Sequence, residues 1–501
     1  MSWKETAAPV LTRMPTVSRP EGHVPFRRKL TWTAGVLVLY FFLTNVLIWG
    51  LQGSGTDAFG QFRTILAGGQ GSILQLGIGP IVTASIVLQL LGGANLLGLD
   101  TNDPRDQSIY QGLQKLLVVV MIFLTGIPLV FFGNFLPASP QLAGELGTSL
   151  FAVQVLIFAQ IAVGGLLILF MDEVISKWGV GSGVGLFIIA GVSQALIGGF
   201  FGWSGLAEGA QDGFFATWFG ILTGQVQTGP LTQLSGIEFL LFGEGELLAL
   251  FTTLLIFGIV VYAESVRVEI PLSHSRVRGA RGRFPVKLIY ASVLPMILVR
   301  ALQANIQFLG RILVSQSPGQ QVITIFGTEL PWLGTYTAQQ GQLQPSGGLF
   351  YYFAPIYSPQ EWIPALSTQP VDIFIRIGVD LTFMVIGGAI FAIFWVETTG
   401  MGPEATAQQI QRSGMQIPGF RKSPGVIEKV LERYIPQVTV IGGALVGLLA
   451  VAANMLGTIG TVSGTGLLLT VSITYKLYEE IAEEQLMEMH PMMRQMFGAN
   501  S

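Results

Sequence analysis

Residues 150–171 read LFAVQVLIFAQIAVGGLLILFM, an apolar stretch that contains no charged side chain. A helix rises about 1.5 Å per residue, so roughly 20 apolar residues cross the hydrocarbon core of a bilayer, which is about 30 Å thick. Other stretches of similar length and character occur along the chain. The ten predicted spans are residues 31–49, 73–92, 113–133, 150–171, 180–202, 247–263, 286–309, 377–396, 437–456 and 460–478.

The composition of the whole chain agrees with this pattern. Of its 501 residues, 50% are hydrophobic and only 11% are charged, and the mean hydropathy is +0.60. A soluble chain carries about 25% charged residues, because its surface needs them whatever the size of its core. Cysteine is absent, which excludes disulfides, iron–sulfur clusters and cysteine-ligated metals. We therefore predict an all-α polytopic membrane protein.

The distribution of basic residues orients the predicted spans, because Lys and Arg accumulate in cytoplasmic loops. With the polar segment 1–30 in the cytoplasm, all but four of the 26 Lys and Arg residues lie on the cytoplasmic side; the exceptions are Arg63, Arg300, Arg311 and Arg376. Segment 1–30 lacks the short apolar stretch and cleavage site of a signal peptide, so we expect the first span to be retained. We predict that both termini are cytoplasmic.

Signatures of enzymes and of ion-coupled carriers are weak. The histidines lie in polar stretches, and the glycine run 179–185 lacks the Lys that a phosphate-binding loop requires. An ion-coupled transporter needs ionisable residues at mid-membrane depth, and only Arg300 and Asp380 lie clearly inside a span. We predict no catalytic residue, no metal and no cofactor. A secondary transporter, an intramembrane enzyme and a membrane scaffold without a pore are the alternatives at this point.

Segment 53–72, GSGTDAFGQFRTILAGGQGS, is too short in its apolar part to span a membrane. One interpretation is a surface helix in an exposed loop. The other is a short helix folded back into the protein, which a membrane tolerates only where the backbone is buried or lines a cavity. Gly77, Gly79 and Pro80 in the second span, and Pro295 in the seventh, indicate close packing or a kink.

The densest basic charge lies in the loops that follow the sixth and the eighth span. Ordinary positive-inside bias with contact to anionic lipid explains such loops. Binding to a phosphate backbone, as on a structural RNA, explains them equally well. The residues alone leave both interpretations open.

Four stretches resemble the Sec translocase channel subunit family, SecY. LGIGPIVTASIVLQLL (76–91) resembles the signature of its second helix, and MDEVISKWGVGSGVGLFIIAGV (171–192) the signature that leads into its fifth. IPGFRKSPG (417–425) resembles the tip of its 8/9 loop, and GTGLLLTVSITYKLYEE (464–480) its tenth helix. They occur in the family's order across nearly the whole chain. The sequence ASVLP (291–295) is similar to that of the archaeal and eukaryotic branch of the family.

The resemblance implies ten transmembrane helices in two pseudo-symmetric, inverted five-helix halves around a central pore that opens sideways to lipid. It implies a channel that conducts secretory polypeptides across the membrane and releases membrane-protein helices through a lateral gate. The expected regions are a cytoplasmic segment 1–30, an N-terminal half 31–202, an extracytoplasmic loop 203–246, a C-terminal half 247–478 with an extracytoplasmic loop 310–376 and a cytoplasmic loop 397–436, and a cytoplasmic tail 479–501.

The resemblance also places a constriction ring on aliphatic residues of four spans. The six ring residues are Val82, Ile86, Ile188, Val192, Ile297 and Leu469. The chemistry of these residues agrees, because all six are apolar and the first two pairs each stand four apart, on one helix face. A ring of aliphatic side chains excludes ions by dewetting.

Further roles follow from the resemblance alone. A plug over about 56–67 includes Thr56, Phe59, Phe62, Arg63, Ile65 and Leu66. Spans two and seven, with three and eight, form the lateral gate, where Asn305 is a polar position and Val87 replaces a hydroxyl residue of the family. The residues that dock the ribosome or another partner are Arg276, Arg278, Arg281, Arg283, Arg421 and Lys422. The implied partners are SecE, a small Sec-beta-type subunit, the ribosome, signal sequences and nascent chains, and lipid, in the cell membrane.

Two charges exceed what the family pattern requires. Arg63 lies in the predicted plug, and Arg300 lies one turn beyond Ile297. We expect Arg300 to face a watery outer funnel.

Overall fold

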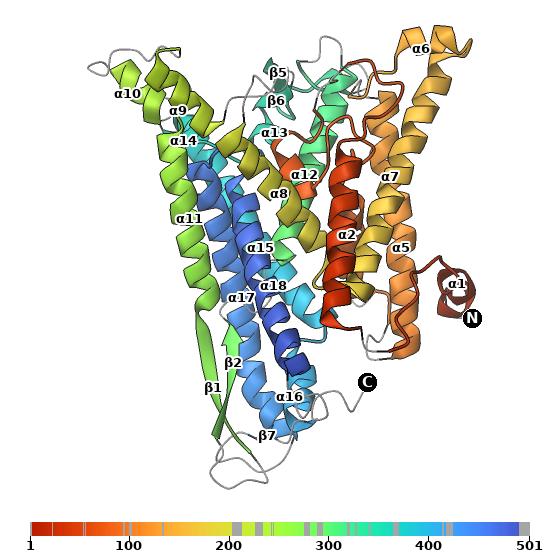
Figure 1. The fold of residues 1–501 in the computed structure, drawn as a ribbon, viewed down its shortest axis with the longest axis vertical. Coiled ribbons are helices and arrows are strands. Elements are labelled where there is room, and N and C mark those ends of the chain that lie inside the picture. The colour runs from red at the N-terminus through yellow and green to blue at the C-terminus, as the bar shows by residue number, and fades with distance from the viewer. Residues whose placement is uncertain are drawn as a thin grey trace.

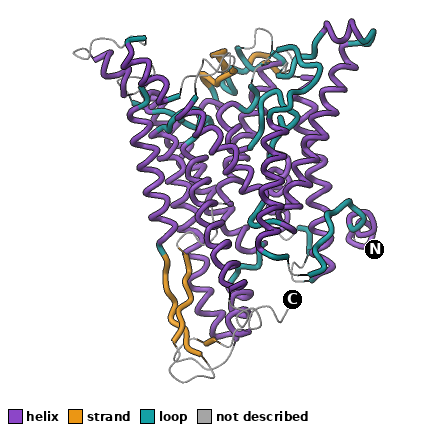
Figure 2. The backbone as a smooth tube through the Cα atoms, viewed as in Figure 1, coloured by secondary structure: helices purple, strands orange, loops and turns teal. Residues whose placement is uncertain are grey.

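The computed structural model describes residues 3–22, 24–53, 55, 57–93, 96–99, 103–132, 135–202, 213–225, 234–241, 243, 245–274, 281–287, 294–317, 321–325, 328–339, 342–363, 370–412, 415–416 and 424–489. Long helices form a bundle, and short strands lie at its two ends (Figures 1 and 2).

A helix overlaps each of the ten predicted spans. These helices are α2 (Phe26–Thr44), α4 (Gly79–Gly93), α5 (Pro104–Ile127), α7 (Leu150–Trp178), α8 (Gly183–Phe201), α11 (Leu247–Ser265), α12 (Leu294–Ser315), α15 (Pro370–Thr398), α17 (Pro424–Leu456) and α18 (Gly464–Met489). Among the described residues, seven helices are long and apolar enough to cross a membrane, namely α5 with its continuation to Phe132, α7, α8, α11, α12, α15 and α17. The helical, membrane-type architecture is confirmed, and the number of crossings stays a prediction.

Shorter elements connect the long helices. The short helices are α1 (Trp3–Leu11), α3 (Arg63–Leu66), α6 (Pro140–Glu145), α9 (Phe214–Thr223), α10 (Leu234–Leu241), α13 (Leu349–Tyr352), α14 (Pro359–Trp362) and α16 (Pro403–Arg412), with a 3₁₀ turn η1 (Gly60–Phe62) and a π-helical turn η2 (Pro128–Phe132). The strands are β1 (Arg267–His274), β2 (Arg281–Lys287), β3 (Thr324–Ile325), β4 (Thr328–Glu329), β5 (Thr335–Gln339), β6 (Gln342–Gly347) and β7 (Met415–Gln416).

The strands form three small antiparallel sheets. Strands β1 and β2 make a hairpin in which Arg267 pairs with Lys287, and β7 joins the free edge of β1. This hairpin and α16 lie at the lower end of the bundle in Figure 1, whereas β5, β6, α6 and α10 lie at the upper end. The hairpin lies between α11 and α12 in the chain, so residues 267–274 and 281–287 of the basic loop after the sixth predicted span form a β-arm.

One helix boundary differs from the prediction for a local reason. Helix α4 begins at Gly79 instead of residue 73, because residues 71–78 form turns in which Gly77 adopts φ +53°. A side chain at Gly77 would lie 2.1 Å from the carbonyl oxygen of Leu66, so this turn requires glycine. Of the two alternatives for Pro295, close packing or a kink, burial of this residue agrees with close packing; it is the second residue of α12, where proline costs no hydrogen bond.

Glycine also permits the closest approach between two long helices. A Cβ atom added at Gly443 in α17 would lie 2.5 Å from the carbonyl oxygen of Gly388 in α15, and the reverse distance is also 2.5 Å. Small residues at such crossings let two backbones pack closely in a membrane, where no hydrophobic effect drives helices together. Helices α15 and α17 therefore pack with their backbones in close contact at this crossing.

Candidate functional site: a plugged pore and its gate

Residues 57–67 fold back into the centre of the bundle. Turn η1 and helix α3 make a compact segment that ends at Ala67 in the left-handed conformation, with φ +53°. Its apolar side chains are buried, with exposed fractions of 7% for Phe59, 4% for Phe62, 2% for Ile65 and 5% for Leu66. Of the two interpretations of this stretch, burial excludes the surface helix. Thr56 lies outside the described residues. We call residues 57–67 the plug.

Three long helices hold one side of the plug. The hydroxyl of Tyr40 in α2 donates to the carbonyl of Ala67 at 3.0 Å, and the N–H of Ile78, just before α4, donates to the carbonyl of Leu66 at 2.8 Å. Gly191 of α8 leaves room for the plug backbone, since an added Cβ would lie 3.3 Å from the carbonyl oxygen of Thr64. The plug is therefore fixed through its backbone as well as by apolar contacts.

Helix α12 holds the other side of the plug. The guanidinium of Arg311 donates to the carbonyl of Ala58 at 2.6 Å, and the ring of Phe308 stacks on Phe59 with centroids 5.2 Å apart. Within the plug, Arg63 pairs with Asp57, and its Nε donates at 3.1 Å. Burial alone would raise the pKa of Asp57, but the hydrogen bond and the charge of Arg63 hold this pKa below its usual range. Arg63, which the family pattern does not require, thus neutralises the buried carboxylate of Asp57.

The six predicted ring residues are all buried in one hydrophobic cluster, with exposed fractions of 3% or less. The same cluster contains Ile65 and Leu66 of the plug. A Cβ atom added at Gly466, near the start of α18, would lie 3.3 Å from Val192 and 3.7 Å from Ile65. The plug therefore contacts the aliphatic cluster where α8 and α18 meet.

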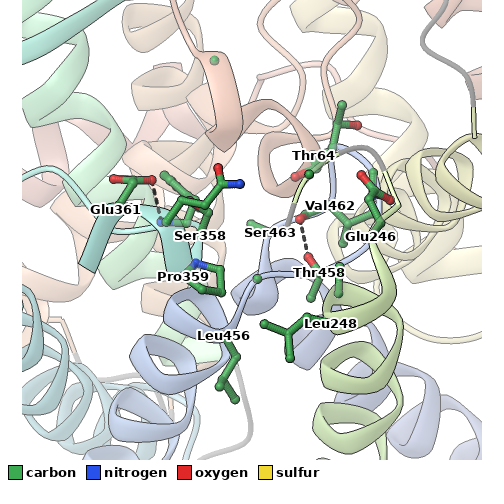
Figure 3. Close-up of a pocket in the computed structure, with 18 of the residues that line it drawn as sticks. Thr64, Glu246, Leu248, Ser358, Pro359, Glu361, Leu456, Thr458, Val462 and Ser463 are labelled. Carbon is green, nitrogen blue, oxygen red and sulfur yellow. Dashed lines mark hydrogen bonds between the residues drawn. The ribbon is translucent and has the colours of Figure 1, made fainter. Parts of the chain in front are cut away.

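A cavity of about 570 Å³ lies on the other side of the plug. Asp57, Arg63 and Thr64 of the plug line it, together with residues 357–361 and the turn between α17 and α18. Figure 3 shows Thr64 near Val462 and Glu246, with Ser358 and Glu361 opposite them. Burial raises the pKa of Glu246, although a hydrogen bond from the N–H of Gly460 opposes this shift. The plug thus borders this cavity through Asp57, Arg63 and Thr64 and joins the aliphatic cluster through Ile65 and Leu66.

Helices α4 and α12 meet through a polar contact. The amide of Asn305 in α12 donates to the hydroxyl of Thr83 in α4 at 3.0 Å, so the structure joins the predicted gate position to the second span. Thr83 was missed in the sequence, although it lies four residues before Val87 and therefore on the same helix face. Thr83 thus supplies the hydroxyl that Asn305 contacts in this structure.

The expectation for Arg300 is wrong. Its exposed fraction is 1%, and it pairs with Asp380 of α15 at 3.5 Å instead of facing a watery funnel. Nη1 also donates to Gln303 at 2.6 Å, and Nε donates to Thr465 of α18 at 3.1 Å. Burying a charge without a partner is costly, so the partner in α15 decides where Arg300 points. This network ties α12 to α15 and α18.

The structure describes two of the six predicted docking residues. Arg281 and Arg283 belong to strand β2, and the other four, Arg276, Arg278, Arg421 and Lys422, lie outside the described residues. At the base of the hairpin, Arg267 pairs with Glu479 of α18 at 2.8 Å, and Lys287 pairs with the same carboxylate. Lys287 also lies over the ring of Tyr475, 5.6 Å from its centroid. The arm is therefore anchored to α18.

The membrane-type helices enclose a short buried helix that borders a cavity and packs into an aliphatic cluster. This arrangement is that of a plugged channel. The family model SecY matches residues 72–478, and the family model described as the plug domain of Sec61p matches residues 38–71. The chain belongs to the SecY family.

Relatives and solved structures agree with this assignment. The protein translocase subunit SecY of Haloferax volcanii is 72% identical over 504 residues and covers 100% of both chains, and that of Halobacterium salinarum is 71% identical over 503 residues and covers 99% of both. The solved structure of a protein-conducting channel is 37% identical with a TM-score of 0.77, covering 96% of this chain and 98% of its own. Sec61 in the canine ribosome–channel complex is 36% identical with a TM-score of 0.74, at the same coverage.

These findings confirm the resemblance and the branch. The chain is the channel subunit of a protein translocase, conducts polypeptides and is closed by a plug; it is not an enzyme.

Proposed function

We propose that this chain seals its pore at rest with two layers, the plug and a ring formed by Val82, Ile86, Ile188, Val192, Ile297 and Leu469. The observation that carries the proposal is the burial of all six residues in one cluster with the plug residues Ile65 and Leu66. Aliphatic side chains from α4, α8, α12 and α18 surround a translocating chain without binding it, and dewetting excludes ions when the pore is empty. The ten helices then form two inverted halves around this ring.

The ring is tested by substitution in reconstituted channels. Ile86→Gly with Ile188→Gly removes two ring side chains from two different helices, α4 and α8, and we expect resting ion conductance to rise. The matched control is Leu254→Gly with Leu255→Gly in α11, because these side chains are 60% and 53% exposed and two helical glycines carry a similar backbone cost. Unchanged conductance of the double variant, or an equal rise in the control, would falsify the ring.

The gate in this proposal lies between α4 and α12, with α5 and α15 beside them. An apolar signal helix that enters between α4 and α12 replaces their contacts, including the bond from Asn305 to Thr83. Because Arg311 and Phe308 also belong to α12, movement of this helix withdraws two contacts from the plug. Opening towards lipid and release of the plug are thus linked through one helix.

Partners and orientation complete the proposal. The excess of Lys and Arg places both termini and the β1–β2 arm in the cytoplasm of a cell whose plasma membrane holds the channel. The relative Sec61 was solved in a ribosome–channel complex, which supports a ribosome on the basic arm with Arg276, Arg278, Arg281, Arg283, Arg421 and Lys422. SecE and a small Sec-beta-type subunit are the expected companions in the membrane. Loss of ribosome binding on Arg421→Ala, with binding retained on Arg13→Ala, tests the docking site.

A further inference from the structure

A second, smaller cavity lies between the plug, α12 and the loop that precedes α14. Its volume is about 110 Å³, enough for about three waters at roughly 30 Å³ each or for one monovalent anion with one or two waters. Its lining includes Phe62 of the plug, Gln307 and Arg311 of α12, and Tyr357, Glu361 and Arg376. The established pore does not use this cavity.

Arg311 brings a buried charge without a balancing partner to this cavity. Its exposed fraction is 7%, its Nη1 donates to the Ala58 carbonyl, and its Nε has no acceptor among the described residues. Buried charges are normally paired. Since a carbonyl is neutral, Arg311 keeps its full charge, and the nearby end of α12 offsets it only partly.

The charged groups around Arg311 already balance one another. Asp57 pairs with Arg63 inside the plug. Glu361 pairs with Arg376 at 3.1 Å through one oxygen and accepts the N–H of Tyr357 through the other. Deeper in the bundle, Arg300 pairs with Asp380. Arg311 is therefore the charge left over in this part of the described structure.

The polar groups that face the cavity are mainly donors. The hydroxyl of Tyr357 is buried and has no partner among the described residues. Burial raises the pKa of Tyr357, so this hydroxyl keeps its proton. The carbonyls of Ala354 and Pro355, which would otherwise attract a cation, already accept from Arg376 at 2.8 Å and 2.7 Å. Two free donors beside the unbalanced charge of Arg311 favour an anion over a cation.

We infer that this cavity binds a small monovalent inorganic anion of the size of chloride, held by the Nε of Arg311 and the hydroxyl of Tyr357. The bound anion supplies the charge that Arg311 lacks. Because Arg311 also contacts the plug, the anion stabilises the closed channel. The inference does not depend on which partner drives translocation.

The direct test is anomalous diffraction from crystals of the full chain grown in bromide in place of chloride. We expect an anomalous peak within hydrogen-bond distance of Arg311 Nε and Tyr357 Oη. Crystals of the Tyr357→Phe variant should show a weaker peak or none. Ordered water without an anomalous peak in the wild-type cavity overturns the inference.

Thermal unfolding gives a second readout in solution. At equal ionic strength, we expect the wild-type protein to melt about 2 °C or more higher in chloride than in gluconate, which is too large for the cavity. Tyr357→Phe should lose most of this difference. The matched control is Tyr352→Phe, whose hydroxyl bonds Asp372 and does not line the cavity. No chloride dependence in the wild type, or the same loss in both variants, overturns the inference.

Discussion

Tyr40→Phe isolates one contact of the plug. Tyr40 is 1% exposed, and its hydroxyl donates to the carbonyl of Ala67 at 3.0 Å. The aromatic ring stacks on Phe187 with centroids 5.0 Å apart, and phenylalanine keeps that contact. The lost hydrogen bond contributes about 1 kcal/mol to the closed state. That amount changes the ratio of displaced to seated plug about five-fold.

Resting ion flux into proteoliposomes measures the displaced state. We expect flux through Tyr40→Phe to be about five-fold higher than wild type, with translocation of a secretory protein retained. Tyr352→Phe again serves as the control, because its hydroxyl bonds Asp372 and not the plug. Equal flux in wild type and Tyr40→Phe would show that this hydrogen bond does not hold the plug.

Three further predictions follow from the charged and polar contacts. Asp380→Leu leaves Arg300 buried without its charged partner, so we expect about 3–5 kcal/mol of destabilisation in thermal or denaturant unfolding. The double variant Asp380→Leu with Arg300→Met should recover most of the lost stability. Failure to recover would contradict the pairing. The pKa of Asp57 is held below its ordinary value of 3.8 when the plug is seated, so the contribution of Asp57 to the stability of the seated plug is complete above that pH and lost below it. We expect ion flux to stay flat between about pH 5 and 8 and to rise only below about pH 3.8. A rise near pH 6 would point to another group. Asn305→Ala removes the hydrogen bond to Thr83, which contributes about 0.5–1.5 kcal/mol. This variant should improve export of proteins with weakly apolar signal sequences. Export reduced to the same extent for strong and weak signals would argue against a gate role.

The helices were predictable because a bilayer requires long apolar stretches, and these stand out in a sequence of 11% charge. The plug was predictable only as one of two interpretations. Its burial depends on Tyr40 and Arg311, which lie far from it in the sequence. The pattern of hydrophobicity along the chain does not predict contacts between residues so far apart in the sequence.

Arg300 shows where sequence reasoning fails. The position of a lone arginine in an apolar span fits a watery funnel as well as a buried ion pair. What decides is Asp380, eighty positions away on α15, together with Thr465 on α18. The sequence shows that Thr83 lies one helical turn from Val87. Its contact with Asn305, which gives Thr83 a role, appears only in the structure.

The start of α4 shows the same limit at the level of the backbone. The apolar pattern begins at residue 73, yet the helix begins at Gly79. The N–H of Ile78 donates to the carbonyl of Leu66 in the plug, and this contact requires the turn at Gly77. Local sequence alone predicts a longer helix there. Only the neighbouring plug explains why it is short.

The central claim is that a translocating chain passes through the aliphatic ring, and its most direct test uses the absence of native cysteine. Single cysteines at positions 82, 188 and 297 are crosslinked to a cysteine in a stalled secretory chain, with position 254 on the exposed face of α11 as the reference. We expect crosslinks at all three ring positions and none at 254. Crosslinks at 254 with none at the ring would contradict the claim.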